Sequence, residues 1–100
     1  MEIIARRVCE CFGADIKDVR LTRKHSAQTG LSRKMILIIL KDDFGCNINT
    51  IGEYMNMSPR TIYIMINKFR KEIAKNPVLS KVRGEIVDYV TKKMKEVVNG

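Results

Sequence analysis

The side chains best suited to chemistry in this sequence lie between residues 58 and 67. Arg60, Thr61, Tyr63 and Asn67 carry a guanidinium, two hydroxyls and an amide. An arginine fork can pair with a guanine edge, and hydroxyl groups can bind phosphate oxygens. These side chains therefore offer the groups that a nucleic-acid contact needs, and the net charge of the chain, given below, favours that interpretation. The alternative interpretation is an ordinary solvated helix face, because charged and polar residues also cover helices that bind nothing.

Two helices joined by a tight bend must position these side chains. Asn47 can cap a first helix over residues 48–55. Ser58 can cap a second helix, and Pro59 then takes its first position, where a missing N–H costs nothing. We expect a helix-turn-helix over about residues 47–75. In that motif the N-terminal end of the second helix enters a DNA major groove, which adds Ser58 and Pro59 to the candidate DNA-binding residues.

The second helix is amphipathic. Its apolar residues are spaced by four, three and four positions, which is one stripe at helical period. This stripe consists of Ile62, Ile66, Phe69 and Ile73. The residues that fall mostly outside the stripe should face a partner or solvent, and they are Arg60, Thr61, Tyr63, Asn67 and Lys71.

The charge of the chain favours an acidic partner. Its 100 residues include 19 Lys and Arg against 11 Asp and Glu, a formal net charge of +8. Such an excess suits nucleic acid or an anionic surface. The length predicts one domain over residues 1–100. The longest strongly apolar run, residues 35–40, is too short to cross a bilayer, and no N-terminal signal is visible. We expect a cytoplasmic, nucleoid-associated protein without a membrane partner.

Metal, cofactor and enzyme chemistry find little support in the sequence. The three cysteines are an odd number, and His25 is the single histidine. Cys9 and Cys11, two residues apart on a helix, should point about 200° apart. Asp42 and Asp43 should likewise diverge into solvent. Without a glycine-rich phosphate loop or a nucleophile–base pair, we expect no metal site, no cofactor and no enzymatic activity.

The remaining periodicity predicts a compact, all-α fold of five or six helices. A first helix over residues 2–12 should end at Gly13, and Asp15 should cap a short helical turn. A central core helix should run from about 31 to 44, since its residues are apolar over more than half of its girth. A last helix should follow Pro77, because proline disfavours helical geometry in the residue before it.

A basic segment precedes the central helix. Residues 20–34 hold five Arg or Lys and no acid, and their first part is rich in hydroxyl residues and loop-like. Such a segment can clamp phosphates or reach into a minor groove, although a solvated linker would look the same. The candidate phosphate contacts are Arg23, Lys24, Arg33, Lys34 and Lys41.

Four segments in this order carry a family resemblance: RKHS, SRKMILIILKDDF, INTIGEYM and TIYIMINK. The chain resembles the C-terminal DNA-binding domain of the bacterial replication initiator DnaA over about residues 3–86. The similarity is strongest from Arg33 to Gly52, where the spacing matches without a gap. It implies a Trp-repressor-like, all-helical fold, duplex-DNA binding, and basic contacts at Lys24 and Lys41.

The DNA-reading motif departs from that family. DnaA proteins usually carry Gly-Gly-Arg-Asp-His-Thr/Ser-Thr-Val between the two motif helices. Here residues 56–62 are one residue shorter and retain only Thr61. Ser58, Pro59 and Arg60 occupy the places of the Asp, the His and the first hydroxyl residue. The chain lacks the family's ATPase module, so we expect an excised domain or, since it begins at Met1, a stand-alone relative.

These observations predict a protein that binds double-stranded DNA sequence-specifically, in replication initiation or its control. Two alternatives stay open. The same scaffold can serve a transcriptional regulator. The last helix should carry an apolar stripe, which can instead serve a protein-interaction adaptor. This stripe consists of Leu79, Val82, Ile86, Val90 and Val97.

Overall fold

The computed structural model describes residues 1–21 and 26–99, and the predicted all-α fold is confirmed. These residues form six α-helices and one π-helical turn, with no strand among them. The elements are α1 (Glu2–Phe12), α2 (Ile16–Leu21), α3 (Ala27–Ile38), η1 (Ile39–Asp43), α4 (Ile48–Met55), α5 (Pro59–Ala74) and α6 (Pro77–Asn99). The predicted single domain fits the one hydrophobic cluster that these elements share.

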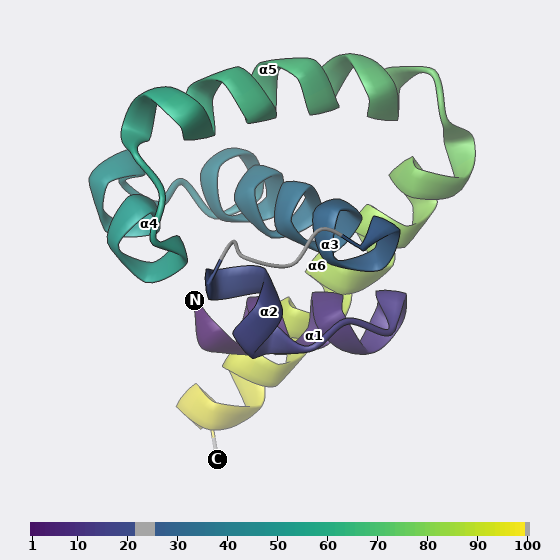
Figure 1. The fold of residues 1–100 in the computed structure, drawn as a ribbon. Coiled ribbons are helices and arrows are strands. Elements are labelled where there is room, and N and C mark those ends of the chain that lie inside the picture. Colours follow the sequence, from purple (N-terminus) through teal and green to yellow (C-terminus); the bar gives the residue numbers. More distant parts are fainter. Residues whose placement is uncertain (22–25, 100) are drawn as a thin grey trace.

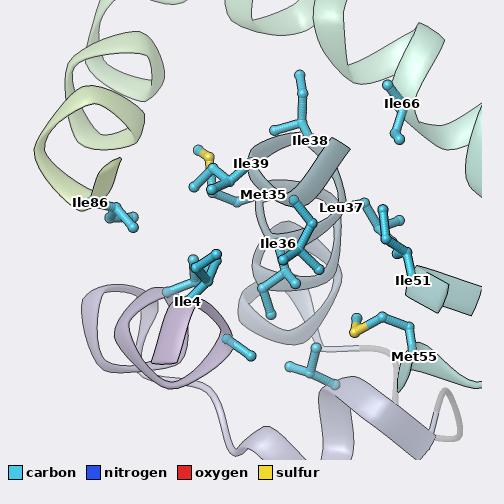
Figure 2. Close-up of a cluster of buried hydrophobic side chains, with 14 of the residues drawn as sticks. Ile4, Met35, Ile36, Leu37, Ile38, Ile39, Ile51, Met55, Ile66 and Ile86 are labelled. Atoms are coloured by element: carbon cyan, nitrogen blue, oxygen red, sulfur yellow. The ribbon is translucent and has the colours of Figure 1, made fainter. Parts of the chain in front are cut away.

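The central helix α3 is the axis on which the other helices pack. In Figure 1 it lies between α5 above and α1 and α2 below. Residues 35–40, MILIIL, are all fully buried. Figure 2 shows the side chains of residues 35–39 leaving the helix in different directions, among Ile4 of α1, Ile51 of α4, Ile66 of α5 and Ile86 of α6. A helix that is apolar all round must be covered on every side, which explains why the helices surround it.

Helix ends follow the capping residues of the sequence. Gly13 ends α1 in the left-handed conformation, with φ 69°. Asn47 and Ser58 accept backbone N–H groups at the starts of α4 and α5, and Asp15 does the same before α2. The predicted caps of these four helices are confirmed.

The start of the central helix was predicted wrongly. It begins at Ala27 rather than near Leu31, because Ser26 accepts the Thr29 N–H and caps it. Thr29 and Ser32 are buried inside the helix. Serine, threonine and glycine in this segment have low helix propensity, which favours a loop. Burial against the rest of the domain outweighs that weak preference.

The C-terminal part of the predicted helix over residues 31–44 is a π-helical turn. The Phe44 N–H donates to Ile39 O at 3.1 Å, five residues back. Gly45, with φ 64°, closes the segment as predicted. The turn widens the helix where it emerges from the core and where two aspartates follow each other.

Asp42 and Asp43 are exposed residues, but each carboxylate binds an arginine instead of standing alone in solvent as the sequence predicted. Arg70 of α5 donates to Asp42 from Nε at 2.8 Å and also from a terminal nitrogen. Arg83 of α6 donates to Asp43 at 2.9 and 3.0 Å. The carboxylates diverge as predicted, but each reaches a different helix. They hold α5 and α6 against the end of α3.

The last helix covers the core with only part of its length. Ile86 and Val90 are buried, whereas Val97, expected on the same side, is 77% exposed. Its final turns therefore extend beyond the core (Figure 1). No helix in the described part of the chain is both long and apolar enough to cross a membrane.

Two isoleucines on α5 provide a test of its buried and exposed faces. Ile66 is 1% exposed and Ile64 is 47% exposed. Because an unpaired buried charge costs on the order of 4 kcal/mol or more, Ile66→Asp should unfold the domain. Ile64→Asp should melt close to the unsubstituted protein. Circular dichroism melting curves measure both, and equal stability of the two variants would contradict this assignment.

Candidate nucleic-acid interface

The bend between α4 and α5 depends on a close backbone approach at Gly52. The N–H groups of Asn56 and Met57 both donate to Gly52 O. Asn56 takes the left-handed conformation with φ 55°, which asparagine tolerates better than most residues. A Cβ on Gly52 would lie 2.6 Å from Met57 O, closer than packed atoms allow. A glycine is therefore required for this bend and for the direction in which α5 leaves α4.

Residue Arg20 of α2 also binds the bend between α4 and α5. Arg20 Nε donates to Tyr54 O at 2.9 Å, and its guanidinium stacks over the Tyr54 ring at 4.3 Å. The amide of Asn56 donates back to Arg20 O at 3.2 Å. The orientation of α5 is thus set by α2 as well as by α4. The sequence analysis missed this role of Arg20, because its partners lie 34 and 36 residues away.

The first turn of α5 carries two hydroxyls that bind each other. Ser58 Oγ accepts the Thr61 N–H at 3.2 Å and lies 2.8 Å from Thr61 Oγ1. Both residues are exposed, so each hydroxyl keeps lone pairs or a proton for a further partner. The helix start also presents backbone N–H groups and the positive end of the helix dipole, which suit a phosphate.

The side of α5 that faces away from α3 is exposed, polar and basic (Figure 1). Arg60, Ile64, Asn67 and Lys71 recur every three or four residues, so they form one row along this side. We call this surface the outward face of α5. Its exposed residues are Arg60, Tyr63, Ile64, Asn67, Lys68 and Lys71. It lies opposite the buried stripe that contains Ile66.

The charges on α5 are sorted between its two sides. Arg70 is paired with Asp42, and Glu72 lies 3.8 Å from Lys34 of α3. By contrast, the cations of the outward face form no ion pair with any residue that the structure describes. These cations are Arg60, Lys68 and Lys71. They remain available to an external anion.

Six of the eleven predicted contact residues come together on α5 and its cap. They are Ser58, Pro59, Arg60, Thr61, Tyr63 and Asn67, and all six are exposed. Lys41 lies half-buried in η1, and Lys34 is engaged with Glu72. Arg23 and Lys24 lie outside the described residues.

Arg33 was predicted wrongly as a phosphate contact. Its side chain is buried, with 6% exposed. Its guanidinium donates to Val19 O at 3.0 Å and to Asp18 O at 3.3 Å. Burial also lowers the pKa of Arg33 from its ordinary value. Arg33 ties α3 to the C-terminal half of α2, where a cation complements the helix dipole, and it is not accessible to DNA.

Sequence reasoning also left out two residues of the outward face. Ile64 and Lys68 are exposed beside Arg60 and Asn67. Both follow from the 3.6-residue period that located the apolar stripe, since they fall on its opposite side. Ile64 was overlooked because an aliphatic residue on a helix is more often part of the core.

Among the described residues no three His, Cys, Asp or Glu side chains come together as metal ligands. A comparison of the chain with protein-family models, with curated proteins and with solved structures gave no match. The outward face of α5 is therefore argued from its own geometry.

Gly52 and Gly84 form a matched pair for testing the bend. An added Cβ meets nothing within 4 Å at Gly84, on the exposed side of α6. Gly84→Ala should stabilise the helix by about 0.5–1 kcal/mol. Gly52→Ala should destabilise the domain by about 1–3 kcal/mol, because the bend must open. Denaturant unfolding measures both, and a Gly52→Ala variant as stable as Gly84→Ala would contradict the close approach.

Proposed function

We propose that this protein binds double-stranded DNA sequence-specifically through α5, in replication initiation or its control. One observation carries the proposal. The outward face of α5 combines an exposed guanidinium, an exposed amide and lysines that form no ion pair with the described residues, while the opposite side of the same helix is buried against the core. A solvated face needs no such mixture, whereas DNA recognition needs both base-reading and phosphate-binding groups.

The dimensions of α5 suit a major groove. An α-helix with its side chains is about 10–12 Å wide, and the groove is about 12 Å wide. Arg60, in the first turn of α5, would reach a guanine edge with its fork. Ile64 and Tyr63 would lie against bases or thymine methyl groups. Lys68 and Lys71 would bind phosphates along the groove.

Other predicted residues would contribute phosphate contacts at the edges of the proposed site. Ser58 and Thr61 would offer hydroxyls to a phosphate at the helix start, beside Pro59. Lys41 stays a candidate phosphate contact on the basis of the sequence, and so do Arg23 and Lys24. Action on the bacterial nucleoid, a Trp-repressor-like fold and a role in replication rest on the similarity of segment order to the DnaA domain.

Two alternatives share parts of this evidence. A transcriptional regulator would use the same face of α5 on different sequences. A protein-interaction adaptor is favoured by the exposed apolar residues at the end of α6, Met94 at 46% and Val97 at 77%. These two classes differ in their response to salt, because an apolar interface is nearly insensitive to ionic strength.

Removing two lysines from α5 tests the phosphate contacts. Lys68→Ala with Lys71→Ala should weaken binding to unrelated duplexes alike and lower the slope of log affinity against log salt by about two. Lys92→Ala with Lys95→Ala removes the same charge from exposed positions near the C-terminal end of α6 and is the control. Equal losses in the two double variants would show that only net charge matters, and would contradict a site on α5.

Arg60→Lys tests base reading. Lysine keeps the charge but lacks the planar fork, so nonspecific affinity should be retained. A guanine contact through the fork is worth roughly 1–3 kcal/mol of discrimination, so the preference at one base pair should flatten. Selecting bound duplexes from a random pool with each protein compares the two motifs. If both proteins select the same motif, Arg60 does not read a base.

A further inference from the structure

A chain of hydrogen bonds links the end of the central helix to the outward face of α5. Arg70 Nε donates to Asp42 Oδ2 at 2.8 Å, and a second Arg70 nitrogen donates to Asp42 Oδ1. The remaining terminal nitrogen of Arg70 donates to Asn67 Oδ1 at 3.1 Å. Asp42 belongs to η1, whereas Asn67 is exposed on α5. The chain therefore connects a group beside the core to a residue of the proposed DNA interface.

The chemistry of arginine fixes the direction of the Asn67 amide. A guanidinium carries only donors, so Asn67 must turn its oxygen toward Arg70. Its NH₂ group then points away from Arg70 and keeps two N–H donors. An asparagine without such a partner can rotate freely and offer either its oxygen or its nitrogen.

Asp42 holds the Arg70 side chain in one position, and so fixes the hydrogen bond to Asn67. Its side chain is 24% exposed, and it lies in η1, two residues after the fully buried run of residues 35–40. Hydrogen bonds from Arg70 hold the pKa of Asp42 below its usual range, so the carboxylate stays charged at neutral pH. A two-pronged, charge-assisted contact of this kind fixes both the position and the plane of the guanidinium.

We propose, on the premise that α5 enters a major groove, that Asp42 and Arg70 are positioning residues that make Asn67 read guanine. Guanine presents two adjacent acceptors, N7 and O6, to an outward NH₂ group. The usual pairing of asparagine with adenine needs the amide oxygen as well as the nitrogen. Here that oxygen already accepts from Arg70, so Asn67 cannot form the two-bond pairing with adenine. Asn67 lies about 10 Å along the helix from Arg60, so the two residues face different base pairs.

Arg70→Lys is the most direct test. Lysine keeps the charge of α5 but cannot hold Asp42 and Asn67 at once. Nonspecific affinity and its salt dependence should stay unchanged, whereas the preference for guanine over adenine at one base pair should fall by about fivefold or more. Duplexes selected from a random pool, followed by affinities for the guanine and adenine versions, measure this.

Arg83→Lys is the matched control. It breaks the equivalent contact with Asp43, but Arg83 lies on α6 and has no hydrogen bond to Asn67. The control should leave the selected motif unchanged. Asp42→Asn alters the same row of hydrogen bonds at its other end, with little change in side-chain shape. It should weaken the guanine preference at the same base pair as Arg70→Lys does.

A double variant separates positioning from mere stabilisation. Asn67→Ala should abolish the preference at that base pair, and adding Arg70→Lys should then change it no further. A purely structural role for Arg70 would instead lower the melting temperature and affect every base pair, with or without Asn67. That result overturns the inference.

The remaining outcomes are distinguishable. If the unsubstituted protein selects no motif, the proposed function fails and this inference fails with it. If it selects a motif that Arg70→Lys and Asp42→Asn leave unchanged, the inference alone is overturned. A selected adenine at the pair that responds to Asn67→Ala would overturn it as well.

Discussion

The constraint on which the rest of the structure depends is the complete burial of residues 35–40. Six consecutive apolar side chains on a helix point in every direction, so no side of this segment can face water. Burying one large aliphatic side chain contributes about 1.5–3 kcal/mol, so the enclosure of this segment strongly stabilises the fold. The helices α1, α2 and α5 pack against α3, and α4 and α6 pack against η1. The helix α5 is one of them, and its opposite side is left to solvent.

The acidic residues of this strongly basic chain pair with some of its cations and leave others at the surface. Among the described residues, three acids pair with cations of another helix: Asp42 with Arg70, Asp43 with Arg83 and Glu72 with Lys34. These acids therefore link elements of the fold. The excess positive charge is left on the surface, and part of it lies in a row along α5. The same contacts that close the domain thus leave its outward face uncompensated.

Much of this arrangement could be predicted from local sequence signals, but its long-range contacts could not. Caps and glycines act within a few residues, so α4 and the start of α5 were placed correctly from Asn47 and Ser58. The pairing of Asp42 with Arg70 joins residues 28 apart, and that of Asp43 with Arg83 joins residues 40 apart. No periodicity along one helix contains that information.

Arg33 shows the same limit for a single residue. A basic segment predicts cations at the surface, yet this guanidinium reaches two carbonyls of α2 and is buried. Composition cannot distinguish an arginine that binds phosphate from one that satisfies the end of a neighbouring helix, since both need the same five donors. Only the position of α2 against α3 decides between them.

The outward face of α5 and the helix start beside it contain residues that serve the fold and residues that do not. Ser58 caps α5 by accepting the Thr61 N–H, so replacing Ser58 with alanine costs about 1 kcal/mol of stability whatever it does to binding. Asn67 is held by Arg70, which ties it to the core. Arg60, Ile64 and Lys71 have no such internal partner among the described residues. Their side chains are therefore the part of this surface that the internal contacts of the fold do not explain.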